Sequence, residues 1–152
     1  MYTFEKSTPV KQKILILNGP NLNLIGSRQT EIYGEQSFEE FLTQLRNSYP
    51  DLQIDYNQSN IEGELIDKIQ SCDSQYTGVV LNAGGYTHSS VAIADAIFAI
   101  SVPVIEVHIS QPKTRERERY FSLIEKACVG TISGFGLSSY KLAVEHLAND
   151  IK

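Results

Sequence analysis

Polar and ionisable side chains follow three apolar runs of this sequence, at the point where each run ends. Asn18 and Asn21 come after the first run, Asn82 follows the second, and Glu106 and His108 close the third. In a parallel α/β sheet, the carboxyl ends of the strands face the crevice in which ligands bind. The pattern therefore predicts a small-molecule active site at one edge of such a sheet.

Glu106 and His108 are separated by one residue, which places both side chains on the same face of a strand. A carboxylate beside an imidazole favours the protonated ring and fixes its orientation. A histidine held in this way is suited to protonate a departing hydroxyl group. The pair is therefore a candidate general acid with its supporting carboxylate.

The elements that must position these side chains alternate between strand and helix. Strands are expected at 13–18, 52–57, 78–82, 103–108 and 127–133, and helices at 37–50, 61–72, 89–100 and 137–150. Ser37 and Glu40 form the pattern of a capping box at the first helix. Strands that alternate with helices predict a parallel sheet with right-handed crossovers. We expect an α/β, flavodoxin-like three-layer sandwich with strand order 2-1-3-4-5.

The chain is expected to have a polar N-terminal leader, residues 1–12, and one catalytic domain, residues 13–152. The segment 21–34 is longer than the usual connection between a strand and a helix. It contains Gly26 and Gly34 as plausible hinges and starts at the predicted crevice. We therefore interpret it as a lid loop that closes over the site.

Composition limits the classes of function. A formal net charge of −5 argues against a nucleic-acid partner, since phosphate binding needs a basic surface. No apolar run has the length of a membrane span, and the N-terminus lacks the apolar core of a signal peptide. Cys72 and Cys128 lack the spacing of a metal or redox motif. We expect reduced structural thiols and a cytoplasmic location.

Five short motifs, in order along the chain, carry a resemblance to a known family. They are Asn18-Gly19-Pro20-Asn21-Leu22, Gly26-Ser27-Arg28 with Tyr33-Gly34, Asn82-Ala83-Gly84-Gly85 with Thr87-His88, Glu106-Val107-His108-Ile109-Ser110, and Arg115 with Arg119. The set resembles the type II 3-dehydroquinases, or 3-dehydroquinate dehydratases. The chain departs from the common family pattern at Gln29-Thr30 and at Gln111-Pro112-Lys113.

The resemblance implies a hydro-lyase that converts 3-dehydroquinate to 3-dehydroshikimate through an enolate, by anti elimination. Tyr33 would be the base that removes the C2 proton, with Arg28 beside it. Lowering the pKa of a phenol from about 10 to about 7 requires about 4 kcal/mol of preference for the phenolate. One arginine about 5 Å away supplies about 3 kcal/mol at an effective dielectric constant near 20. Arg119 or Arg115 could add to that positive field.

The resemblance also implies a role for each remaining site residue. His108, supported by Glu106, would protonate the departing C1 hydroxyl, and Asn21 would hold a water molecule against the developing enolate oxygen. The substrate carboxylate would be held by the Asn82 side chain and by backbone amides at a turn, those of Ile109 and Ser110. The ring hydroxyls would be bound by His88 and Arg119.

Asp95 is expected to act between subunits. We place His88 at the start of a helix and Asp95 seven residues on, about 10 Å along its axis and out of reach. Apolar neighbours leave that helix little solvent-facing surface, which favours an interface. In the family this aspartate reaches the site of a neighbouring subunit, within trimers that assemble into a dodecamer. The resemblance implies no cofactor and no metal, and it fits either shikimate biosynthesis or quinate catabolism.

Other functions remain open at this point. A flavodoxin-like binding or receiver module would need an acidic cluster or a hydroxylated phosphate loop after the first strand, where Asn-Gly-Pro-Asn stands instead. A metal hydrolase could use His88, His108, Glu106 and Asp95 as ligands. A Schiff-base dehydratase would need a buried lysine, for which Lys113 is the nearest candidate. An inactive relative of the enzyme is a further alternative.

Overall fold

The computed structural model describes residues 11–27 and 35–150. Its strands are β1 (Lys13–Asn18), β2 (Gln53–Gln58), β3 (Gly78–Asn82), β4 (Val104–His108) and β5 (Gly130–Ser133). Its α-helices are α2 (Phe38–Ser48), α3 (Glu62–Gln70), α4 (Val91–Phe98) and α5 (Ser138–Asp150). In the described residues these strands form one sheet, all in parallel, with the order β2-β1-β3-β4-β5. The expected strand order is confirmed.

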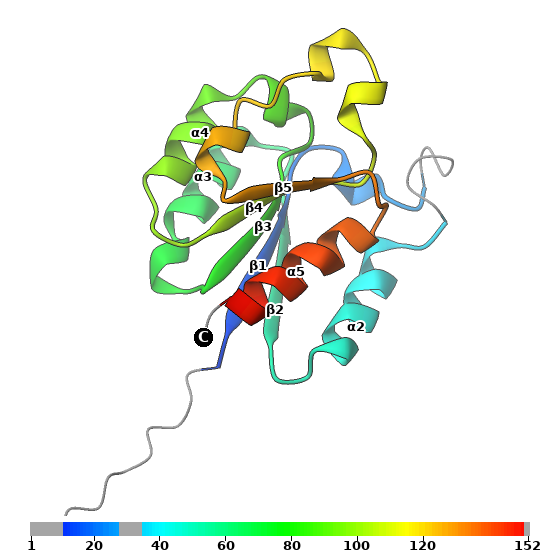
Figure 1. Cartoon of the computed structure of the whole chain (residues 1–152), viewed down its shortest axis with the longest axis vertical. Helices are drawn as coiled ribbons and strands as arrows, with labels where there is room; N and C mark the ends of the chain where they lie inside the picture. Colours follow the sequence, from blue (N-terminus) through cyan, green and yellow to red (C-terminus); the bar gives the residue numbers. More distant parts are fainter. Residues whose placement is uncertain (1–10, 28–34, 151–152) are drawn as a thin grey trace, which may run out of the picture.

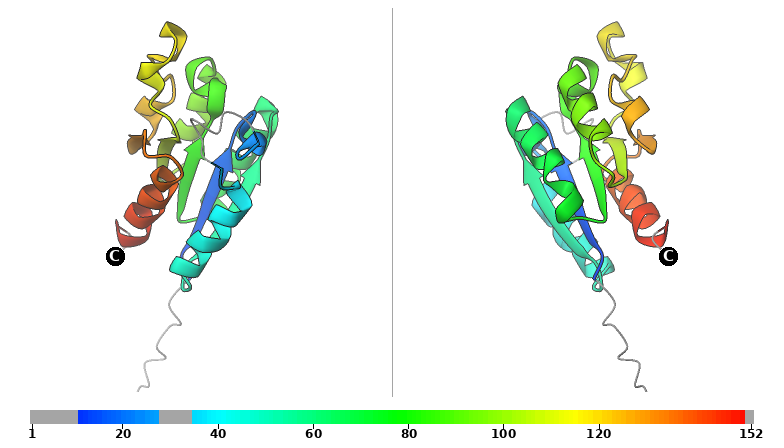
Figure 2. Two further views of the ribbon diagram at one scale, coloured as in Figure 1. Left: turned by 90° about the vertical axis from the view of Figure 1, so that its right-hand side faces the viewer. Right: turned by 90° about the vertical axis from the view of Figure 1, so that its left-hand side faces the viewer.

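Helices cover both faces of this sheet, which makes the flavodoxin-like three-layer sandwich (Figures 1 and 2). Alternate residues of each strand point to opposite faces. Ile14 and Ile16 of β1 therefore pack with α2 and α5, whereas Leu15 and Leu17 pack with α3 and α4. Two hydrophobic cores hold the sheet rigid, so the carboxyl ends of its strands are fixed relative to one another.

Local sequence signals explain the edges of several elements. At the start of α2, the Ser37 hydroxyl accepts from the Glu40 N–H, and the Glu40 carboxylate accepts from the Ser37 N–H, which confirms the predicted capping box. The bounds predicted for β1 and β3 are confirmed, and β2 lies one residue later than expected. Among the described residues, no helix is long and apolar enough to cross a membrane.

Several predicted elements are shorter than expected, and three of them differ at a boundary that local contacts define. The helix expected from residue 61 begins at Glu62 and ends at Gln70, and Ile61 is 59% exposed rather than part of the buried helix face. The helix expected from residue 89 begins at Val91, because the Ser90 hydroxyl accepts from the Ile93 N–H and caps it there. Strand β5 begins at Gly130 rather than at residue 127, because residues 125–127 form a 3₁₀ turn.

Two expectations fall on residues outside the described ranges. The N-terminal leader, residues 1–12, is described only at its last two positions. The lid loop, residues 21–34, is described up to residue 27 and includes a 3₁₀ turn at Leu22–Leu24. Arg28 and Tyr33 lie outside the described residues.

Candidate active site

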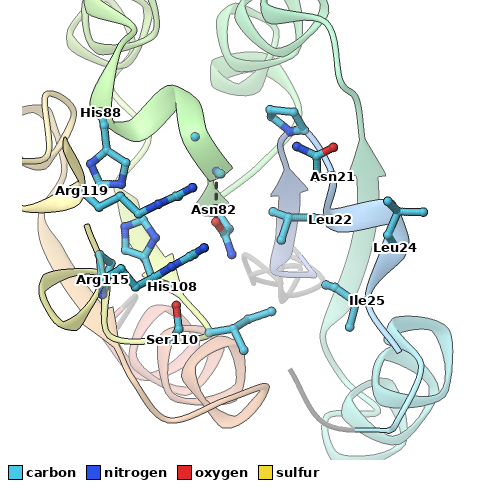
Figure 3. A pocket seen from close by; sticks show the side chains of 15 residues that line it. Asn21, Leu22, Leu24, Ile25, Asn82, His88, His108, Ser110, Arg115 and Arg119 are labelled. Carbon is cyan, nitrogen blue, oxygen red and sulfur yellow. Dashed lines mark hydrogen bonds between the residues drawn. The ribbon is translucent and has the colours of Figure 1, made fainter. Parts of the chain in front are cut away.

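A cavity of about 260 Å³ lies at the carboxyl ends of β1, β3 and β4. Figure 3 shows side chains from these strand ends and from the following loops converging on it. Predicted site residues that line the cavity are Asn21, Asn82, His88, His108, Ile109, Ser110 and Arg119, together with Arg115. The expectation that polar residues after separate strands meet at one edge of the sheet is therefore confirmed.

Two backbone segments cross closely beneath this cavity. The Gly19 N–H donates to the carbonyl of Asn82 at 2.7 Å. A Cβ atom at position 19 would lie 2.5 Å from the Ala83 carbonyl oxygen, so a side chain there would collide with backbone. Gly84 adopts a φ of +58°, a conformation that glycine reaches without strain. These two glycines allow the loops after β1 and β3 to bring Asn21 and Asn82 to the same cavity.

The amide of Asn82 has its orientation fixed by its neighbours. Its Oδ1 accepts from the Gly84 N–H at 3.2 Å, and its Nδ2 donates to the Tyr140 hydroxyl at 2.8 Å. The Tyr140 hydroxyl in turn donates to Asn18 Oδ1 at 2.8 Å. A backbone N–H can only donate, so Oδ1 is the atom at Gly84 and the amide cannot be reversed. Asn82 therefore presents an N–H donor to the cavity, as anion binding requires.

The buried pair at the end of β4 has the geometry that the sequence predicts. His108 Nε2 lies 2.6 Å from Glu106 Oε1, and the two residues are 8% and 1% exposed. The second carboxylate oxygen, Oε2, accepts from the Ser122 hydroxyl at 2.9 Å. Glu106 lies behind His108 rather than at the cavity wall. It can therefore act on a ligand only through the imidazole.

His88 lies beside His108 on the cavity wall. The two rings are stacked, with centroids 6.3 Å apart and planes inclined by 19° (Figure 3). His88 Nδ1 lies 2.8 Å from the Phe121 carbonyl oxygen, so Nδ1 carries the proton and Nε2 is the nitrogen left for a ligand. The expectation that His88 begins a helix is wrong: it ends a 3₁₀ turn, Gly84–His88, that precedes α4.

Two arginines complete the cavity and share one carboxylate. Arg119 Nε lies 2.7 Å from Glu116 Oε1, and Arg115 Nε lies 3.8 Å from Glu116 Oε2. The hydrogen bond from Arg119 lowers the pKa of Glu116, which keeps this carboxylate charged. Because the contacts are made through Nε, the terminal guanidinium nitrogens remain for anionic or hydroxylated ligands (Figure 3).

Asp95 is a predicted site residue that lies away from the cavity. It lies on the exposed side of α4 and does not line the cavity of its own chain. Because His88 precedes α4 rather than belonging to it, the argument that both share one helix face is wrong. Asp95 lies between Val91 and Phe98, which are 62% and 64% exposed. The expectation of little solvent-facing surface is thus wrong for the single chain, which has a partly apolar exposed face here.

Sequence reasoning missed two residues that hold the site from behind, Ser122 and Tyr140. The sequence Ser122-Leu-Ile-Glu125 has the form of a turn or helix cap, so nothing in it indicated a contact with a carboxylate on a distant strand. Tyr140 belongs to the apolar face of α5, where an aromatic residue is usually part of the core. Only the fold brings their hydroxyls to Glu106 and Asn82.

The alternatives find little support in this geometry. In the described ranges, no three His, Cys, Asp or Glu side chains are grouped as a metal ion would require. Lys113 lies in an exposed 3₁₀ turn, Pro112–Thr114, and is not buried as a Schiff-base lysine is expected to be.

Comparisons with known proteins agree on one family. The profile of the family described as "Dehydroquinase class II" matches residues 12–148. The 3-dehydroquinate dehydratase of Exiguobacterium sp. is 49% identical over 142 residues, which cover 90% of this chain and 97% of that protein. The 3-dehydroquinate dehydratase of Pelodictyon phaeoclathratiforme is 48% identical over 136 residues, covering 88% and 90%. The crystal structure of the type II dehydroquinase from Butyrivibrio crossotus superposes with a TM-score of 0.85 at 43% identity, covering 91% of this chain and 98% of that chain.

Proposed function

Because the chain belongs to the class II dehydroquinase family, and thus has the activity of a 3-dehydroquinate dehydratase, a hydro-lyase of the shikimate pathway, we propose that its cavity performs the dehydration with Tyr33 as the base and His108 as the general acid. The observation that carries this assignment is the buried Glu106–His108 pair at the cavity wall. A carboxylate 2.6 Å from Nε2 fixes the orientation of the ring and leaves the other nitrogen, Nδ1, for a departing hydroxyl.

Substrate binding is assigned to the polar groups around this pair. The fixed N–H of Asn82 and the turn at Ile109 and Ser110 would take the substrate carboxylate, which the arginines of the cavity attract. His88 and Arg119 would hold the ring hydroxyls. Tyr33 is assigned to C2 of the ring by the family resemblance.

The proposed elimination has two steps. In the first, the C2–H bond breaks, the proton passes to the phenolate oxygen of Tyr33, and the electron pair forms an enolate. Arg28 supports the phenolate, and a water molecule held by Asn21 stabilises the enolate oxygen. In the second, the enolate collapses to the ketone, a C1–C2 double bond forms, and the C1–O bond breaks. The departing oxygen takes the proton of His108 and leaves as water, by anti elimination.

Asp95 is assigned to the site of a neighbouring subunit, where it would contact His88 Nε2. Support comes from its position on α4, between exposed apolar side chains that a partner chain would cover. Following the family, the assembly would be a trimer, with four trimers forming a dodecamer.

The test uses purified full-length protein and 3-dehydroquinate. We expect the ultraviolet absorbance of the conjugated enone to rise at an unchanged rate in EDTA, and borohydride to trap no adduct on the protein, because the proposed chemistry uses only side-chain acids and bases. Activity that disappears with EDTA, or a lysine adduct trapped by borohydride, would contradict the proposal.

A further inference from the structure

The hydroxyl of Ser122 donates its proton to a carboxylate oxygen of Glu106. Its oxygen accepts hydrogen bonds from the backbone N–H groups of Ile124 and Glu125, at 3.2 and 3.0 Å. Because an amide N–H can only donate, neither group can receive the serine proton. Among the residues that the structure describes, the remaining polar contact of this hydroxyl is Glu106 Oε2 at 2.9 Å. The hydroxyl proton is therefore directed at the carboxylate.

Glu106 depends on this contact because it is almost fully buried. Each of its oxygens has one donor, Ser122 at Oε2 and His108 Nε2 at Oε1. A buried carboxylate that lacks donors is costly, and it either takes up a proton or rotates toward another donor. Either change would alter the face that it presents to His108.

Within residues 11–27 and 35–150, the side-chain hydrogen bonds to the Glu106 carboxylate come from His108 and Ser122. Cys128 lies near Glu106, but burial and the charge of Glu106 raise the pKa of this thiol to about 12, so it is neutral and only a weak donor. The backbone carbonyl of Phe121, directly before Ser122, contacts His88 Nδ1. The dipeptide 121–122 thus contacts one histidine of the stacked pair directly and the other through Glu106.

We propose that Ser122 is a positioning residue of the dehydration: it fixes the Glu106 carboxylate so that His108 keeps Nε2 toward Glu106 and turns Nδ1 to the departing hydroxyl. Ser122 does not line the cavity, so it would act on a bound substrate only through other residues. Its effect is therefore on the proton transfer and not on binding. This inference rests on the proposed function, since it assigns a supporting group to the same general acid.

The first test compares Ser122→Ala with Ser122→Thr in the full-length protein. The alanine variant is expected to lower kcat by about 10- to 100-fold, the usual effect of losing one hydrogen bond to a charged group, with KM changed less than about twofold. Threonine keeps the hydroxyl and should return kcat to within about threefold of the parent. Ser122→Cys, nearly isosteric but a poor donor, replaces the alanine variant if that variant does not fold.

Ser59 provides a matched control. Its hydroxyl also accepts from a backbone N–H two residues on, that of Ile61, and donates to a glutamate, Glu64, but it does not contact Glu106 or His108. Ser59→Ala should keep kcat within about twofold of the parent. If Ser59→Ala lowers kcat as much as Ser122→Ala does, the effect is a general consequence of losing a serine hydroxyl bonded to a glutamate and the inference fails.

A double-mutant cycle separates positioning from a purely structural role. If Ser122 acts only through Glu106, adding Ser122→Ala to Glu106→Gln should lower kcat by less than about threefold further, because the carboxylate that it orients is gone. If the two substitutions lower kcat independently, so that their fold-changes multiply, the inference is overturned. A Ser122→Ala variant with the kcat of the parent would overturn it as well. A parent that fails to dehydrate 3-dehydroquinate, or a fully active His108→Ala variant, would instead overturn the proposed function.

Discussion

Asn82 can present only one N–H to the cavity, because its carbonyl oxygen is held by Gly84 and its other N–H by Tyr140. His88 and Glu106 are restricted in the same way, each by a contact from residues 121–122. At the residue scale, the chemistry of the site therefore depends on groups behind the cavity wall as much as on those that face it. Groups fixed before the substrate arrives need little rearrangement as charge develops.

The base can be tested by removing one oxygen atom. Tyr33→Phe is expected to lower turnover by at least about 100-fold while a product analogue still binds, because the hydroxyl supplies the base and the ring supplies most of the packing. Steady-state kinetics and calorimetric binding of the analogue measure the two effects. Tyr76→Phe, which removes a hydroxyl bonded to Asp55, is the matched control. Turnover of Tyr33→Phe within tenfold of the parent would reject Tyr33 as the base.

At the scale of elements, helix α5 links the fold to the site. It covers one face of the sheet and places the fully buried Tyr140 between Asn18, at the end of β1, and Asn82, at the end of β3. The contact ties the carboxyl ends of two neighbouring strands to one helix. Under the proposed function, stability and substrate binding both depend on this hydroxyl.

Tyr140→Phe should lower both the stability of the fold and the affinity for the substrate. Asn82 Nδ2 and Asn18 Oδ1 each lose a buried partner, so we expect a loss of about 1–3 kcal/mol in the free energy of unfolding, together with a higher KM. Urea denaturation and steady-state kinetics measure these effects. Tyr76→Phe again serves for comparison. The Tyr76 hydroxyl bonds to Asp55, which is partly exposed, so loss of this hydroxyl should lower the free energy of unfolding by less. Equal costs for the two variants, with KM unchanged, would show that the Tyr140 hydroxyl does not support Asn82.

Sequence periodicity could predict the sheet and its order, because buried parallel strands such as β1 and β3 are continuous apolar runs. It could also place Asn21, Asn82 and His108 at one cavity, because strand ends converge, whereas His88, Ile109, Ser110 and Arg119 are expected from the family resemblance. It could not predict that α4 begins after Ser90, since that boundary depends on one serine cap. Nor could it find Ser122 or Tyr140, whose partners are 16 and 58 residues away in sequence.

For the whole molecule, the shared-site proposal predicts complementation between inactive chains. His88→Ala and Asp95→Ala are each expected to be nearly inactive, and mixing them under conditions of subunit exchange should restore part of the activity. A mixed trimer can combine an intact His88 from one chain with an intact Asp95 from the next. The rate of enone formation before and after mixing measures the effect. If subunits demonstrably exchange and no activity returns, Asp95 acts within its own chain or on folding.

Alkaline pH should destabilise the fold. Burial raises the pKa of Cys72 to about 11 and of Cys128 to about 12, and burial together with Asp55 raises that of Tyr76 to about 12. These groups are neutral in the folded state and ionise earlier when unfolded, at about 8.5 for Cys and about 10 for Tyr. Their contribution to stability is present below about pH 8.5 and is lost as the pH rises toward 12.

The urea midpoint should therefore fall between pH 7.5 and pH 10.5. A variant with both Cys72→Ala and Cys128→Ala should show a smaller fall over the same interval, because two of the groups with a raised pKa are removed. A midpoint that is constant or rises with pH in the parent would contradict this account.

The close approach of two backbone segments at Gly19 limits the substitutions that this sequence can accept during evolution. Any replacement at position 19 brings a Cβ atom against the Ala83 carbonyl, whereas a Cβ at Gly63, on the surface of α3, meets no atom within 4 Å. A substitution of glycine should therefore be tolerated at position 63 and not at position 19, although neither residue has a reactive group. The invariance to be expected of Gly19 among descendants of this gene therefore follows from the close contact of two backbones and not from catalysis.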